Sequence, residues 1–145
     1  MLEEVFTGVY TKFKMHFYRQ VFKRFENREA TLTTVETFCM ESIAALGCPT
    51  VAEFSAFMNI STPNAAYKIS SLVQKGYLEK VRSDEDKREY RLYPTKKYFD
   101  YFNISYNYVK TVMNRIEERF SADDINKLEE MLCIINDELM ADAAK

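Results

Sequence analysis

Hydrophobic residues recur every three or four positions along most of this chain, which is the spacing of one face of an α-helix. In the first long segment, residues 3–26, one aromatic row at that spacing consists of Phe6, Tyr10, Phe13 and Phe17. A second row in the same segment consists of Tyr18, Phe22 and Phe25. Together they form an apolar face wider than a lone surface helix needs. We therefore expect this helix to be buried on two sides or to pack against another subunit.

Two Thr-x-x-Glu capping boxes, at residues 33–36 and 50–53, predict the starts of two further helices. Gly47 ends the first of them, because glycine readily takes the left-handed conformation that follows a helix. Asn59 ends the second, shorter helix in the same conformation. After a tight turn, Ser61 is placed to cap a third helix.

This third helix, residues 61–76, has two contrasting faces and ends at Gly76. Its predicted buried side consists of Ala65, Ile69, Leu72 and Val73. Its other side consists of Asn64, Tyr67, Lys68, Ser71 and Lys75. The second face offers hydrogen-bonding groups and positive charge, and none of its residues is acidic.

Two β-like stretches follow, at residues 77–83 and 89–93, and they flank a charged turn at residues 84–88. Their aromatic and β-branched residues predict a hairpin with a charged tip. Helical spacing then resumes in two segments. The first contains Phe99, Phe102, Tyr106, Val109, Met113, Ile116 and Phe120. Ser121 caps the second, which contains Ile125, Leu128, Leu132, Ile135 and Leu139.

The charge of the chain is unevenly distributed. The 145 residues carry a formal net charge of −2, but residues 68–97 hold 9 basic and 5 acidic side chains, a net of +4. Residues 98–145 hold 5 basic and 10 acidic side chains, a net of −5. A basic segment within an otherwise acidic protein is typical of a nucleic-acid-binding element, although a solvated lysine-rich face has the same composition.

The order of the predicted elements decides between these interpretations. A helix-turn-helix followed by a β-wing occupies the middle of the chain, between a long N-terminal helix and two long C-terminal helices. In such a unit the second helix enters the major groove of DNA. The wing tip can place an arginine in the minor groove. We therefore predict a mostly α fold with a small β-wing. The scarcity of turn residues, 3 Gly and 3 Pro, agrees with long helices.

Over about residues 5–140, the chain resembles the MarR family of winged helix-turn-helix transcriptional regulators. The family's Leu-x-x-x-Gly-Leu pattern is matched at residues 72–77, and its wing pattern Asp-x-Arg at residues 86–88. Two departures stand beside these matches. Family members often carry Thr-Arg or Ser-Arg where this chain has Ala66 and Tyr67, and Tyr98 replaces a usual glycine after the wing. The first departure leaves the target sequence open.

The resemblance implies a homodimer. Residues 1–30 would form an N-terminal dimerisation helix, residues 31–97 the DNA-binding region and residues 98–145 the C-terminal dimerisation helices. A two-fold dimer is expected to bind a pseudo-palindromic site on double-stranded DNA, most often as a repressor. In the family the wing arginine, here Arg88, reaches the minor groove, and the aspartate, here Asp86, orients it.

Nine residues are the predicted DNA contacts. Asparagine pairs well with adenine, lysine and serine suit guanine or phosphate, and a helix N-terminus favours phosphate. Arginine and lysine around the wing would hold phosphates and fix the register. The nine residues are Ser61, Thr62, Asn64, Tyr67, Lys68, Ser71, Arg82, Lys87 and Arg88.

The resemblance also implies a small-molecule effector, because many relatives release DNA when an aromatic anion binds between the dimer helices and the winged helix. The candidates for such a pocket are Tyr10, Phe13, Phe17, Phe38 and Met40. The alternative for all of them is that they simply form core.

Other classes of function are poorly supported. The sequence has no Gly-rich phosphate loop, no recognisable pair of catalytic carboxylates and no Ser/Cys–His arrangement, so we expect no enzyme and no cofactor. The single histidine, His16, and three separated cysteines predict no metal site. No apolar run approaches the roughly 18 residues of a membrane span, and no secretory signal is recognisable. We expect a cytoplasmic protein.

Two alternatives stay open beside the DNA-binding regulator. The first is a winged-helix protein-interaction module with weak DNA binding, which Tyr67 and the acidic C-terminal region suggest. The second is a regulator with a thiol redox switch at Cys48 or Cys39.

Overall fold

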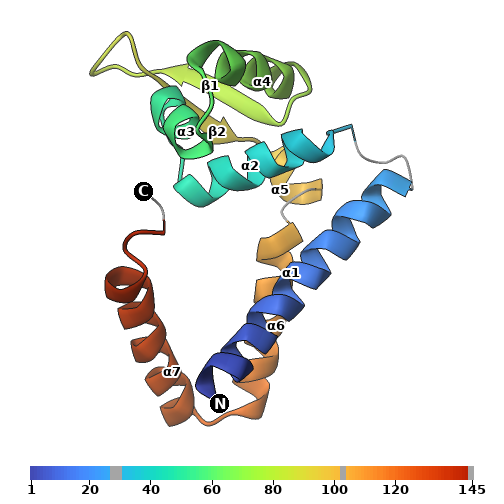
Figure 1. Cartoon of the computed structure of the whole chain (residues 1–145), viewed down its shortest axis with the longest axis vertical. Helices are drawn as coiled ribbons and strands as arrows, with labels where there is room; N and C mark the ends of the chain where they lie inside the picture. The colour runs from blue at the N-terminus through green and yellow to red at the C-terminus, as the bar shows by residue number, and fades with distance from the viewer. Residues whose placement is uncertain (27–30, 102–103, 144–145) are drawn as a thin grey trace. The chain divides into compact units, whose positions relative to one another are not determined.

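The computed structural model describes residues 1–26, 31–101 and 104–143. The elements, drawn in Figure 1, are α1 (Leu2–Glu26), α2 (Thr34–Leu46), α3 (Val51–Met58), α4 (Thr62–Gln74), β1 (Leu78–Arg82), β2 (Tyr90–Pro94), α5 (Lys96–Tyr101), α6 (Ile104–Arg119), α7 (Ala122–Ile134) and a π-helical turn, η1 (Ile135–Leu139). The predicted mostly helical fold with a small β-wing is confirmed. The chain forms two compact units: the helical unit, Met1–Phe17 with Ser105–Lys145, and the winged-helix unit, Tyr18–Ile104.

Side chains next to the helix ends explain where the helices begin. Thr33 Oγ1 accepts a hydrogen bond from the Glu36 backbone N–H, and Glu36 Oε1 accepts one from the Thr33 N–H, which completes the predicted capping box of α2. Thr50 accepts from the Glu53 N–H at the start of α3, which is one half of the second predicted box. Ser61 caps α4 in the same way.

The ends of these helices also follow the sequence prediction. Gly47 has φ 70° after α2, and Asn59 has φ 51° after α3, so both take the left-handed conformation. Gly76 has φ 84° directly after α4, a conformation that strains any residue with a Cβ atom. The chain therefore turns sharply from α4 into the wing.

The wing is an antiparallel hairpin in which Leu78 pairs with Pro94 and Arg82 with Tyr90. The predicted strands at 77–83 and 89–93 are confirmed within one residue at each end. The segment before α3 extends this sheet, because Thr50 forms a bridge with Arg91 and the Leu92 N–H donates to the Pro49 carbonyl. The wing is thus fastened to the helix-turn-helix that precedes it.

The winged-helix unit has its own apolar core, to which α2, α3, α4, both strands and α5 contribute. The buried core residues are Leu32, Cys39, Met40, Ile43, Phe54, Ala65, Ile69, Leu72, Tyr77, Leu78, Leu92 and Tyr98. Val73, which we predicted to be buried, is exposed; the buried face of α4 is narrower than its apolar sequence suggests. Tyr98 keeps its hydroxyl paired by donating to Glu41 Oε1 over 2.7 Å, and burial, followed by the Glu41 charge, raises the pKa of Tyr98.

The helical unit is built differently. None of its described side chains is buried, although α6 and α7 carry apolar residues at helical spacing. Tyr108 on α6 stacks on His16 of α1 with 3.7 Å between ring centroids, and meets Phe13 edge-on at 5.5 Å. The predicted helix through residues 99–120 contains Phe102, which lies outside the described residues, as does the side chain of Phe25.

Candidate nucleic-acid interface

The N-terminal half of α4 presents polar groups at its surface. Ser61 Oγ accepts from the Asn64 N–H over 3.3 Å, and Ser61, Thr62 and Asn64 are exposed. The positive end of the helix dipole makes this end favourable for an anion such as phosphate. One turn further on, Tyr67 is 77% exposed and Lys68 is half-exposed. Five of the nine predicted contacts therefore lie within two turns of one helix.

The C-terminal half of α4 is different, because its polar side chains are bonded within the protein. Ser71 Oγ donates to Glu36 Oε2 over 2.9 Å, and Lys75 Nζ lies 2.8 Å from Glu36 Oε1. Ser71 thus lies in a contact between α4 and α2, which nothing in its sequence neighbourhood indicated. A DNA contact by Ser71 stays a prediction.

The wing tip brings Asp86 and Arg88 together. Asp86 Oδ1 accepts from the Arg88 backbone N–H over 2.9 Å and from Arg88 Nε over 3.2 Å. These two kinds of hydrogen bond from Arg88 lower the pKa of Asp86, so the carboxylate stays charged. The Arg88 side chain is nevertheless 91% exposed. Arg88 Nη2 also donates to Asp86 Oδ2 over 3.4 Å, so Asp86 holds the guanidinium on the surface of the wing.

The remaining wing cations support the turn. Arg82 Nε donates to the Lys87 carbonyl over 2.6 Å, across the hairpin, and both side chains are exposed. Arg91, on the second strand, donates to the Cys48 carbonyl over 3.1 Å and so contributes to the attachment of the wing.

The predicted effector residues do not share one environment. Tyr10 and Phe38 are exposed, Phe13 and Phe17 are half-buried, and Met40 is fully buried in the core of the winged-helix unit. Met40 is therefore a core residue, which was the alternative to its predicted place in an effector pocket. Tyr10, Phe13 and Phe17 belong to the helical unit, and Phe38 and Met40 belong to the winged-helix unit. The pocket itself stays a prediction.

The cysteines differ in their suitability for redox chemistry. Cys39 is buried, and burial raises the pKa of its thiol, so the reactive thiolate is disfavoured. Cys48 is half-buried in the turn after α2, with φ 56°. Within the described residues, no group of three or more His, Cys, Asp or Glu side chains could hold a metal ion. In the same part of the chain, no helix is long and apolar enough to cross a membrane.

The fold and this surface define a class of protein. A cationic helix with an exposed N-terminal half lies next to a hairpin that carries an exposed arginine, and both rest on one core, which is the arrangement of a winged helix. Residues 32–90 match the model of the MarR family. Over these residues, the match bears out the resemblance to the MarR family that the sequence predicts.

Solved structures share the fold along nearly the whole chain. Transcriptional regulator Tm0710 from Thermotoga maritima is 16% identical, with 99% of this chain and 97% of that chain covered and a TM-score of 0.60. A MarR family protein from Bacillus stearothermophilus is 16% identical, with 96% and 93% covered and a TM-score of 0.62. Streptococcus pneumoniae FabT, in complex with DNA, is 22% identical, with 97% and 96% covered and a TM-score of 0.60. Among curated proteins there is no significant match.

Proposed function

We propose that this protein is a homodimeric, sequence-specific DNA-binding transcriptional regulator that acts as a repressor. The observation that carries the proposal is the exposed, acid-free N-terminal half of α4 beside a wing whose exposed Arg88 guanidinium is oriented by Asp86. Structures with this fold include FabT in complex with DNA. The net charge of +4 over residues 68–97 supports the same partner.

The proposed contacts divide by groove. Asn64, Tyr67 and Lys68 would face base edges and phosphates of the major groove, while Ser61 and Thr62 would hold a phosphate at the helix N-terminus. Arg88 would enter the minor groove, where narrow A·T tracts attract positive charge. Arg82 and Lys87 would contact phosphates on either side of it.

The helical unit supports dimerisation. α6 and α7 border a groove of about 410 Å³ lined largely by apolar side chains, including Met113, Ile116, Leu128 and Leu132. A single copy leaves these side chains in water, at a cost of about 25 cal/mol per Å² of apolar surface. A second copy would cover them, and the resulting two-fold axis would select a pseudo-palindromic operator. Release by a small aromatic ligand is part of the proposal.

The direct experiment is affinity selection of random genomic fragments by the purified protein. Enriched fragments are then titrated at two salt concentrations. We expect a palindromic motif that is bound at least ~10³-fold more tightly than random DNA, with affinity that falls steeply as salt rises. A folded dimer that enriches no fragment at either salt concentration would contradict the proposal.

A second candidate is a protein-interaction module. It is favoured by Tyr67, which is large, exposed and placed where relatives often have an arginine. This candidate predicts absent or salt-insensitive DNA binding. The same titration therefore separates the two functions.

A further inference from the structure

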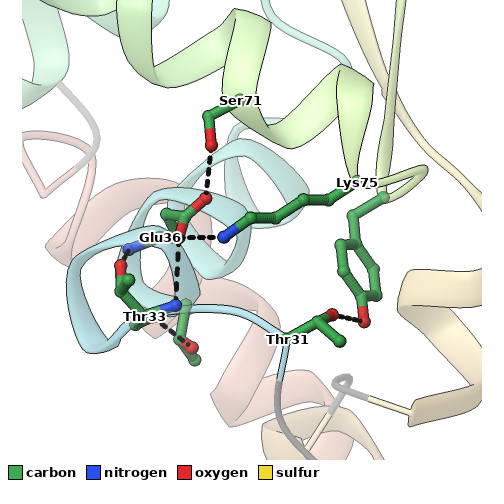
Figure 2. A network of polar contacts seen from close by, with 7 residues as sticks. Thr31, Thr33, Glu36, Ser71 and Lys75 are labelled. Atoms are coloured by element: carbon green, nitrogen blue, oxygen red, sulfur yellow. Dashed lines mark hydrogen bonds and ion pairs between the residues drawn. The ribbon is translucent and has the colours of Figure 1, made fainter.

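The strongest polar cluster of the winged-helix unit lies away from the proposed DNA-contacting half of α4. Figure 2 shows Glu36, in the first turn of α2, facing Ser71 and Lys75 in the last turns of α4. Glu36 Oε1 accepts from the Thr33 N–H over 3.0 Å and from Lys75 Nζ over 2.8 Å. Glu36 Oε2 accepts from Ser71 Oγ over 2.9 Å. One carboxylate thus caps its own helix and bonds to a second helix at two points.

This carboxylate is enclosed rather than solvated. The Glu36 side chain is 10% exposed, and the Lys75 side chain 33%. Burial alone would raise the pKa of Glu36, but the hydrogen bonds from Lys75, Thr33 and Ser71 outweigh it and lower the pKa to about 2. A charged group at such a place is costly unless every partner is present, so the geometry of the three partners is tightly specified.

The end of α4 is held from a second side as well. Lys97 Nζ donates to the Lys75 carbonyl over 2.8 Å, and Thr95 Oγ1 donates to the Gly76 carbonyl over 2.7 Å. Lys97 also lies 4.4 Å from the centre of the Tyr77 ring, whose hydroxyl is hydrogen-bonded to Thr31. The last turn of α4 is therefore bonded both to α2 and to the segment that follows the wing.

The spacing along α4 gives this cluster a consequence for recognition. Lys68, Ser71 and Lys75 share one face of the helix, at intervals of three and four residues. Lys68 makes no hydrogen bond or ion pair with Glu36, whereas Ser71 and Lys75 are both bonded to it. Only the N-terminal part of this face presents unengaged polar groups.

We propose that Glu36 is a positioning residue for DNA recognition: it fixes the C-terminal turn of α4 on α2 and keeps Lys75 and Ser71 bonded within the protein, so that only the N-terminal half of α4 contacts DNA. This inference rests on the proposed function. Lys75, whose charge and helix face would suit a DNA contact, is assigned to the scaffold, and so is Ser71, which is one of the nine contacts that the sequence predicts.

The first test compares two lysines on the same helix face, Lys75→Met and Lys68→Met. The slope of log affinity against log salt falls by about one when a phosphate-contacting lysine is removed. We expect Lys68→Met to lower the slope by about one and Lys75→Met to leave it unchanged, whatever its affinity. A fall of about one in Lys75→Met would overturn the assignment of Lys75.

The second test uses Glu36→Gln, with Glu53→Gln as its matched control. Glu53 takes the same position after its capping threonine in α3, but it is exposed. We expect Glu36→Gln to reduce the ratio of operator to random-DNA affinity roughly tenfold, the scale of one charge-assisted hydrogen bond, and Glu53→Gln to leave it unchanged. Lys75→Arg, which can still pair with Glu36, is expected to keep the ratio that Lys75→Met loses. An unchanged ratio in Glu36→Gln would contradict the positioning role.

A third measurement does not depend on DNA. Amide hydrogen exchange of the free wild-type protein and Glu36→Gln reports opening of the last turn of α4. We expect faster exchange at residues 72–76 in Glu36→Gln and none of this effect in Glu53→Gln. If the wild type selects no DNA, the proposed function fails. Equal exchange in Glu36→Gln and the wild type would separately contradict the inference that Glu36 fixes the last turn of α4 on α2.

Discussion

The two units of this protein use similar amounts of apolar sequence in opposite ways. In the winged-helix unit, twelve core residues enclose one another, and even the polar groups of Glu36 and Tyr98 are buried with partners. In the helical unit, no described side chain is buried, and Met131, Leu132 and Ile134 of α7 lie in the open. The first unit encloses its apolar core within one copy of the chain, whereas the apolar side chains of the second unit are exposed to solvent in one copy.

The largest expected effect comes from placing a charge on the uncovered surface. Leu132→Glu changes a side chain that is 43% exposed in a single copy, so it should hardly affect an isolated chain. In a dimer that buries this position, an unpaired carboxylate would cost several kcal/mol, on the order of the penalty for a buried charge. We expect the variant to be monomeric in analytical ultracentrifugation at concentrations where the wild type is dimeric.

The control for this prediction is Glu129→Gln, a change at a neighbouring groove residue that introduces no charge. A Leu132→Glu variant that sediments as the wild type does would show that α7 is not part of an interface.

The next effect tests the complete unit. Phe54 is fully buried in the winged-helix core. Phe54→Ala should lower the free energy of unfolding by about 3–5 kcal/mol, because it leaves a cavity as well as losing apolar contact. Urea unfolding followed by circular dichroism measures this. The control is Phe57→Ala, because Phe57 lies on the same helix but is exposed, so its loss should lower the free energy of unfolding far less. Equal losses of stability in the two variants would contradict the assignment of Phe54, and not Phe57, to the core.

Acid should act on the winged-helix unit through Glu36. Its pKa is lowered to about 2, so the folded state favours the carboxylate over the unfolded state, where the value is near 4.5. The resulting stability is present above about pH 4.5 and is lost as the pH falls towards 2. At about 1.4 kcal/mol per pKa unit, the loss amounts to about 3 kcal/mol.

Unfolding of the wild type and Glu36→Gln at pH 5.5 and pH 2.5 checks this expectation. The glutamine variant should lose less stability between the two pH values, because it has no carboxylate at this position to protonate. Parallel losses in the two proteins would remove Glu36 from the acid response.

The smallest effect concerns DNA rather than folding. Arg88→Ala should weaken operator binding by roughly 1–3 kcal/mol and leave the unfolding curve unchanged, because the Arg88 side chain is 91% exposed. Competition titrations on the selected operator measure the loss. Glu85→Ala, another exposed residue of the same turn, is the control. Unchanged operator affinity in Arg88→Ala would remove the wing from the mechanism.

Much of the fold could be predicted because its signals are local. The capping side chains of Thr33, Ser61 and Ser121 bond within three residues of themselves, so their sequence context is sufficient. The same holds for the wing tip, where Asp86 and Arg88 are two positions apart. The positive φ of Gly47 and Asn59 follows from residue type at a helix end.

The sequence by itself thus determined the helices, the hairpin, the position of the wing arginine and the resemblance to a winged-helix regulator, because each depends on neighbours in the chain. Only the tertiary structure decided which polar side chains are bonded within the protein and which apolar side chains are buried. The bonds from Ser71 and Lys75 to Glu36 span 35 and 39 residues, and no periodicity within α4 indicates them. Val73 and Met40 are both apolar residues of helices, yet Val73 is exposed and Met40 is buried. Contacts between distant segments depend on how the helices pack together, and packing is a property of the whole core.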